Sequence, residues 1–127
     1  MFLPLVDWFG DEEVARLFSE ESLVDAWLEV ERALASAQGE LGVIPREAAT
    51  VIEAVAVPEH VDLAHLRSRV LAVGYPILPL LEQIGERSPE AARFVHWGAT
   101  TQDIMRTTMP THISRPARPR WCRCSRS

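Results

Sequence analysis

The sequence predicts an all-α protein, and two observations carry that prediction. Apolar residues recur at helical spacing through most of the first hundred residues, with no sustained alternation of the kind that strands show. Residues that can cap helices stand ahead of the apolar stretches, among them Ser19, Asp62 and Ser88. The chain has 127 residues, of which 47% are hydrophobic and 24% charged, so it fits one globular domain.

The longest predicted helix runs from Ser19, which can cap it, to Gly42, which suits a left-handed residue past its end. Its apolar residues recur at alternating steps of four and three, which predicts a heptad-like seam on one face: Leu23, Trp27, Val30, Leu34, Ala37 and Leu41. Charged residues off the seam are expected to face water: Glu29, Glu31, Arg32 and Glu40. A helix of about 22 residues is roughly 33 Å long. Two interpretations of such a stripe stay open, a small bundle core and a surface that packs on other helices.

Shorter helices are predicted on both sides of this one. Acidic residues followed by apolar ones predict a short helix over 11–18. Further apolar faces at helical spacing predict helices over 48–55, 63–73 and 77–84. The tripeptide Ser88-Pro89-Glu90 predicts one more helix start, with a capping hydroxyl, a proline in the first turn and an acid behind it.

Polar groups of several kinds concentrate in one segment after this last start. It offers an imidazole, two hydroxyls, an amide and a carboxylate within eight residues: His96, Thr100, Thr101, Gln102 and Asp103. Either threonine, followed by Gln102-Asp103, also predicts a helix N-terminus, whose free N–H groups and positive dipole end suit a bound carboxylate. From the residues alone a plain helix cap is the favoured interpretation, because Ser and Thr caps are common. An anion site stays open as the alternative.

The same segment resembles a known family. The run His96-Trp97-Gly98-Ala99-Thr100-Thr101-Gln102-Asp103-Ile104-Met105 is similar to the first of three conserved regions in the fumarase/aspartase superfamily. Its form is that of the branch containing 3-carboxy-cis,cis-muconate cycloisomerases and adenylosuccinate lyases. Earlier segments resemble the same branch: Trp27 to Glu31, Leu41 to Pro45, and Gly74-Tyr75-Pro76. The resemblance runs nearly in register over residues 1–105, with no large gap.

The resemblance implies the N-terminal helical domain of a fumarase/aspartase-type subunit, with the long central helix bundle missing. Enzymes of this superfamily are homotetrameric, cofactor-free lyases or cycloisomerases that act on small carboxylate substrates, in the muconate branch during aromatic catabolism. Their carbanion-like intermediates are stabilised by fixed hydrogen-bond donors. By position, the resemblance implies that His96 is catalytic and that four residues bind substrate: Thr100, Thr101, Gln102 and Asp103.

Two parts of the family's site do not occur in this sequence. One is the second conserved region with its proton-transfer histidine, and the other is the mobile Gly-Ser-Ser loop that carries the serine base. The resemblance therefore predicts a fragment that is inactive alone. An interaction module that oligomerises through the seam and meets an anionic partner with a basic tail stays open, as does a small lyase with an unusual site.

Charge divides the chain at residue 105. Residues 1–105 carry 7 arginines and all 18 acidic residues, whereas residues 106–127 carry 6 arginines and no acid. We therefore expect a helical lyase domain at 1–105 and an Arg/Pro-rich tail at 106–127 that is disordered, dispensable for folding and read from a shifted frame. A basic arm for nucleic acid is the rival interpretation, and the loss of family likeness at a single residue weighs against it.

Neither a membrane span nor a metal site is predicted. Apolar runs stop short of the roughly 20 residues that a spanning helix needs. The start lacks the features of a secretory signal, so a cytoplasmic protein is expected. Cys122 and Cys124 are separated by one residue, which is too few for the usual paired zinc spacing. No cofactor is expected, and His60 and His65 are given no role.

Overall fold

The computed structural model describes residues 15–16 and 18–110, and its longest helix, α3, spans Glu20–Glu40. Ser19 caps this helix as predicted, because its hydroxyl oxygen accepts a hydrogen bond from the Ser22 amide at 3.2 Å. Past the other end, Gly42 has a φ of 71°, in the left-handed region that glycine adopts without strain. Both predicted helix ends are confirmed. Most of the helix predicted over 11–18 lies outside the described residues, which include only 15, 16 and 18 of that range.

Shorter helices follow α3 along the chain. They are α4 (Arg46–Val55), the 3-10 turn η1 (Pro58–His60), α5 (Leu63–Val73), α6 (Ile77–Arg87), α7 (Pro89–Phe94) and a last helix over 101–110. Asp62 accepts from the His65 amide at 3.0 Å and Ser88 accepts from the Ala91 amide at 3.3 Å, so both predicted caps are confirmed. The described residues contain no strand, which confirms the all-α prediction. None of their helices is long and apolar enough to cross a membrane.

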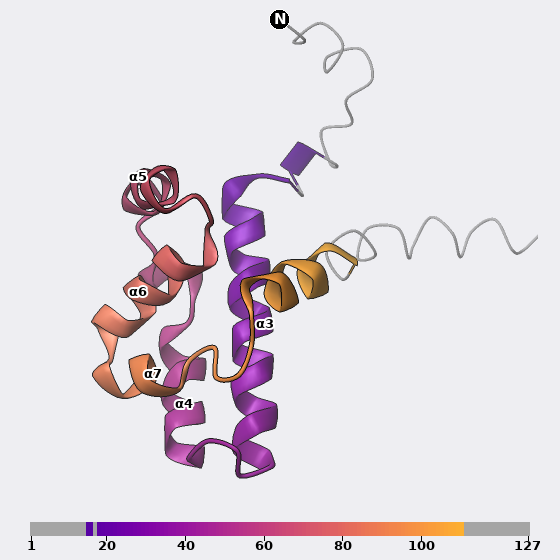
Figure 1. Cartoon of the computed structure of the whole chain (residues 1–127), viewed down its shortest axis with the longest axis vertical. Coiled ribbons are helices and arrows are strands. Elements are labelled where there is room, and N and C mark those ends of the chain that lie inside the picture. The colour runs from indigo at the N-terminus through magenta and orange to yellow at the C-terminus, as the bar shows by residue number, and fades with distance from the viewer. Residues whose placement is uncertain (1–14, 17, 111–127) are drawn as a thin grey trace, which may run out of the picture.

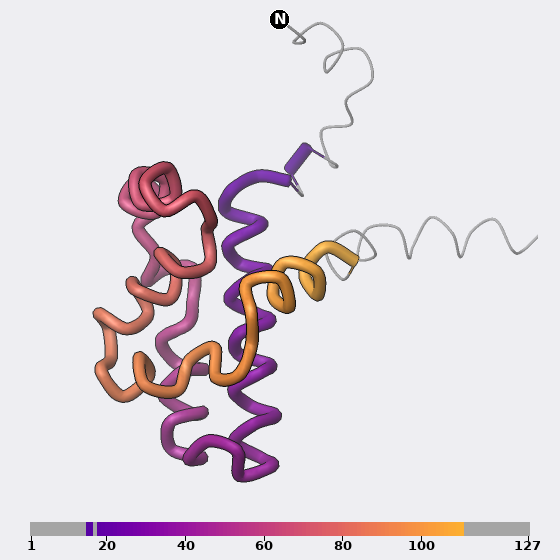
Figure 2. The backbone as a smooth tube through the Cα atoms, viewed as in Figure 1, coloured from indigo at the N-terminus to yellow at the C-terminus, as the bar shows by residue number. Residues whose placement is uncertain are grey.

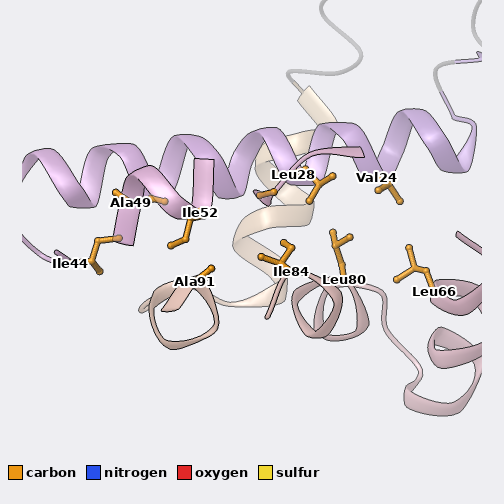
Figure 3. Close-up of a cluster of buried hydrophobic side chains, with 11 residues drawn as sticks. Val24, Leu28, Ile44, Ala49, Ile52, Leu66, Leu80, Ile84 and Ala91 are labelled. Atoms are coloured by element: carbon orange, nitrogen blue, oxygen red, sulfur yellow. The ribbon is translucent and has the colours of Figure 1, made fainter. Parts of the chain in front are cut away.

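The helices share one core built against α3. Figure 1 shows α4, α5, α6 and α7 on the same side of α3, while the last helix crosses it. Helix α4 packs on α3 and α7, and α6 packs on α5 and α7. Side chains from α3 to α7 meet in one apolar layer (Figure 3), which includes Val24, Leu28, Ile44, Ala49, Ile52, Leu66, Leu80, Ile84 and Ala91.

The buried face of α3 is displaced by about one residue from the predicted seam. The buried residues recur at steps of three and four, with Ala26 beside them: Val24, Leu28, Glu31, Ala35 and Gly39. The residues of the predicted seam lie on the neighbouring face, half-buried near the start of the helix and exposed at its end, where Leu41 is 79% exposed. The interpretation of the seam as this chain's own core is therefore wrong, whereas a surface that packs on other helices stays open. The expectation that Glu31 faces water is also wrong, because this residue is 1% exposed.

Small side chains explain the orientation of α3. A Cβ atom added to Gly39 would lie 2.6 Å from the Cβ of Ala49 in α4, which is too close for any real pair of carbon atoms. The two helices therefore approach through their smallest residues, with Ala35 one turn before Gly39 on the same ridge. With small residues of this ridge facing α4, the residues of the predicted seam lie on the flank of α3.

The last helix crosses the predicted domain boundary at residue 105. It continues through 110, and Ile104 and Thr108, four residues apart on one face, are each 1% exposed. The Thr108 hydroxyl donates to the Ile104 carbonyl at 2.8 Å, which satisfies it inside the protein. The prediction that the tail is disordered from residue 106 onward is therefore wrong for residues 106–110, which are helical. The rest of the predicted tail, 111–127, lies outside the described residues.

The contact between α3 and α4 can be tested by substitutions at Gly39 and Ala49. In a helix, alanine is more favourable than glycine by roughly 0.8–1.0 kcal/mol when nothing obstructs its methyl group. We expect Gly39→Ala to lower the free energy of unfolding in the natural chain, because the new Cβ meets Ala49. In an Ala49→Gly background the same change is expected to raise it. Urea unfolding followed by circular dichroism measures both effects, and the same sign in both backgrounds would contradict the contact.

Candidate functional site

The connection between α7 and the last helix is held against α3. Figures 1 and 2 trace it from α7 to the flank of α3. Nδ1 of His96 lies 2.6 Å from Oε1 of Glu31, and Nε2 of Gln38 donates to the Trp97 carbonyl at 2.7 Å. Glu31 and Gln38 are seven residues apart, so they lie on the same face of α3 two turns from each other. Two polar contacts from one helix therefore fix two successive residues of the connection.

His96 adopts a backbone conformation that is uncommon for residues other than glycine. Its φ is 60°, in the left-handed region. Such conformations cost on the order of 1–3 kcal/mol and persist where surrounding contacts hold them. Its side chain is 16% exposed, which leaves one part of the ring accessible.

Glu31 is a buried carboxylate that the sequence analysis missed. Its side chain has no exposed surface, and its second oxygen, Oε2, is buried without a hydrogen-bond partner among the described residues. Burial raises the pKa of Glu31, because desolvation disfavours the ionised form, and the hydrogen bond with His96 opposes that effect. A signal was present in the sequence: Glu31 follows Val24 and Leu28 at steps of four and three, on one helix face.

Thr100 and Asp103 form a reciprocal cap at the start of the last helix. Oδ2 of Asp103 accepts from the Thr100 amide at 2.8 Å and from its hydroxyl at 2.7 Å, and the Asp103 amide donates back to the Thr100 hydroxyl at 3.3 Å. The hydrogen bonds from Thr100 hold the pKa of Asp103 below its ordinary value, and the nearby His96 and Arg106 contribute to the same shift. The helix start predicted here is confirmed, with Thr100 as its cap.

Thr101 and Gln102 are the first two residues of the last helix, and they have hydrogen-bonding groups without a partner in the described part of the chain. Their amides stand where helix geometry provides no intrahelical partner. The Thr101 hydroxyl makes no hydrogen bond within the described part of the chain, and Thr101 is half-buried while Gln102 is exposed. A helix N-terminus attracts anions through its free N–H groups and its dipole. The groups available to an anion are therefore those of Thr101 and Gln102, since Thr100 and Asp103 bind each other.

In the described part of the chain, the groove that His96 lines does not include the other predicted site residues. His96 lines a shallow groove bounded by α5, α6 and α7, together with Arg69 and Glu82, which form an ion pair at 2.9 Å. Residues 100–103 do not line it. A second groove, apolar and about 380 Å³ in volume, lies between α3 and α5 and contains none of the predicted site residues. The described residues contain no cluster of side chains that could hold a metal ion, and Cys122 and Cys124 lie outside them.

Comparison with known proteins identifies the family. No protein-family model matches the chain. The chain is 40% identical over 105 residues to 3-carboxy-cis,cis-muconate cycloisomerase from Acinetobacter baylyi, and 35% identical over 104 residues to adenylosuccinate lyase from Pyrococcus abyssi. These matches cover 78% and 82% of this chain. The matched part of the chain belongs to the fumarase/aspartase superfamily.

The fold agrees with this superfamily. The structure matches that of a fumarate lyase from Mesorhizobium sp. BNC1 with a TM-score of 0.77 and 45% identity, over 82% of this chain and 25% of that one. The chain spans about a quarter of the length of the curated relatives it matches, 23% for both the cycloisomerase and the adenylosuccinate lyase. The predicted membership of the fumarase/aspartase superfamily and the predicted N-terminal helical fold are confirmed.

Substitution of the two adjacent threonines distinguishes the cap from its neighbour. Thr100→Ala removes a hydroxyl that takes part in two hydrogen bonds of the reciprocal cap, so we expect it to lower the free energy of unfolding by about 1 kcal/mol. Thr101→Ala removes a hydroxyl without a partner in the described residues and is expected to change it by less. Urea titrations of the two variants under identical conditions measure the difference. A larger loss for Thr101→Ala would contradict the assignment of the cap.

Proposed function

We propose that this chain supplies one part of the substrate site of a cofactor-free lyase or cycloisomerase, with a 3-carboxy-cis,cis-muconate-type carboxylate as substrate. The observation that carries the proposal is the start of the last helix. There Thr101 and two free amides stand a few residues after His96, which α3 holds in a strained conformation. The likeness to a muconate cycloisomerase and to an adenylosuccinate lyase supports the same class of reaction.

The chemistry of this class fits the groups present. Removal of a proton beside a carboxylate moves negative charge into that carboxylate, and preorganised donors aimed at the charge lower the barrier. In the proposal, the Thr101 hydroxyl and the free amides of residues 101 and 102 donate to the substrate carboxylate. His96 contacts the substrate through its accessible ring edge. Thr100 and Asp103 hold the start of the helix in shape, and Gln102 lies at its exposed side.

The proposed site is completed by other parts of a longer assembly. The chain spans about a quarter of its curated relatives, and its sequence contains no Gly-Ser-Ser loop of the kind that the family resemblance implies. Apolar side chains of α3 remain exposed or half-buried, from Trp27 to Leu41, which supports packing on further helices. We propose a homotetrameric cytoplasmic assembly in which this segment provides the first conserved region. The 127-residue chain alone is then inactive.

The inactivity of the isolated chain is directly measurable. The loss of each general acid or base typically lowers a rate roughly 10²–10⁴-fold. We therefore expect the purified chain to show no turnover of 3-carboxy-cis,cis-muconate, adenylosuccinate or fumarate above a protein-free control, in ultraviolet assays of each substrate. Turnover that disappears in the His96→Ala variant would contradict the expectation and favour a small active lyase.

The role of Thr101 can be tested in a chimera. The matched segment of the Acinetobacter baylyi cycloisomerase is replaced by the corresponding residues of this chain, with which it shares 40% identity. In an active chimera, Thr101→Ala is expected to lower kcat by about 10²–10³, the usual loss for one donor to a developing negative charge. His96→Ala is expected to lower kcat as well, with the assembly intact by size-exclusion chromatography.

A threonine outside the site provides the matched control. The Thr50 hydroxyl donates to the Arg46 carbonyl at 3.1 Å on the exposed surface of α4, so Thr50→Ala is expected to leave kcat unchanged. Full activity of the Thr101→Ala chimera, with a loss of stability in its place, would remove Thr101 from the proposed site.

A further inference from the structure

A buried carboxylate of α3 contacts the ring of His96. Glu31 lies at 0% side-chain exposure on the inner face of α3, and its Oε1 is 2.6 Å from Nδ1 of His96. One residue further along the connection, the Trp97 carbonyl is bound by Gln38. The backbone between these contacts cannot shift without breaking one of them. The ring of His96 therefore takes its orientation from α3, although 65 residues separate it from Glu31 in the sequence.

The partner of Nδ1 decides which ring nitrogen is available for chemistry. An ionised carboxylate can only accept hydrogen bonds, so a neutral histidine beside it must carry its proton on Nδ1. The lone pair then lies on Nε2, across the ring from Glu31, where it can accept a proton or a hydrogen bond. If Glu31 were instead protonated and donated to Nδ1, the proton of His96 would be on Nε2 and the exposed edge would be a donor. The two arrangements have opposite chemistry at the groove.

We propose that Glu31 is the positioning residue of His96, holding its ring in place and fixing the tautomer with the proton on Nδ1 and the lone pair on Nε2. The burial of Glu31 supports a specific role, because a carboxylate removed from water with one oxygen unpartnered destabilises a fold in which an apolar residue would pack well. The strained φ of His96 is a second feature that this contact helps to hold in place. The consequence for catalysis rests on the proposed function, whereas the tautomer does not.

The tautomer can be read directly in the full 127-residue chain. Long-range proton–nitrogen correlation spectra of the nitrogen-15-labelled protein at pH 8 show which ring nitrogen carries the proton. We expect the proton of His96 on Nδ1. His60 provides an internal reference, because its Nδ1 lies 2.9 Å from the Val55 carbonyl, which can only accept. His65 provides the opposite reference, since it is exposed and its ring makes no hydrogen bond within the described residues.

The variant Glu31→Gln tests whether Glu31 causes the preference for the proton on Nδ1 of His96. The amide has nearly the same size as the carboxylate but can donate as well as accept, so we expect the preference for the proton on Nδ1 to be lost at His96 and retained at His60. Glu40→Gln, at the exposed end of the same helix, is expected to change neither histidine. Circular dichroism verifies that each variant is folded. Should Glu31→Gln fail to fold, Glu31→Met removes the acceptor while keeping an apolar side chain of similar length, with the same result expected.

Two results would overturn the proposal. One is a proton on Nε2 of His96 in the natural chain, and the other is an unchanged spectrum of His96 in the folded Glu31 variant. Neither measurement involves turnover or substrate. Failure here therefore leaves the proposed lyase or cycloisomerase role standing, and failure of the chimera experiment leaves the pairing of Glu31 with His96 standing.

Discussion

The close approach of α3 to α4 determines where the rest of the chain lies. Gly39 faces Ala49 with no room for another carbon atom, and this contact sets the rotation of α3 about its axis. Ala35 and Glu31 follow at steps of four on the same ridge and so are turned inward as well. Helix α7 packs on α4, and the connection after α7 returns to α3 at Glu31. The position of His96 thus depends on Gly39, more than two helix turns from Glu31, and on Ala49 in α4.

The features that could be predicted from the sequence are those whose causes are local. A capping side chain binds an amide two or three residues ahead, so Ser19, Asp62 and Ser88 mark helix starts without any knowledge of the tertiary structure. The rotation of α3 could not be predicted in this way. Hydrophobic periodicity gives weight to large residues such as Trp27, whereas close packing of two helices is decided by small ones. The difference of one residue between the two faces follows from that choice.

The candidate site also has one part that could be predicted from the sequence and one part that could not. The segment from His96 to Asp103 could be found from its residues and its family resemblance, and the reciprocal cap of Thr100 with Asp103 follows from a spacing of three. Glu31 was missed although it follows Val24 and Leu28 at helical spacing, because a charged residue in a helix is ordinarily solvent-exposed. Its pairing with a histidine 65 residues later could not be predicted, because no periodicity within α3 contains that information.

The pairing of Glu31 with His96 places stability and function in opposition at one position. A leucine at residue 31 would fit the apolar face formed by Val24, Leu28 and Ala35, and it would remove the penalty of a desolvated carboxylate. It would also remove the hydrogen-bond partner of Nδ1 of His96, so the contact that orients the ring would be lost. Since Oε2 of Glu31 is also buried without a partner among the described residues, local stability gives no reason for this side chain. In the proposed arrangement, the carboxylate holds the ring of His96 and leaves the lone pair on Nε2, across the ring from Glu31.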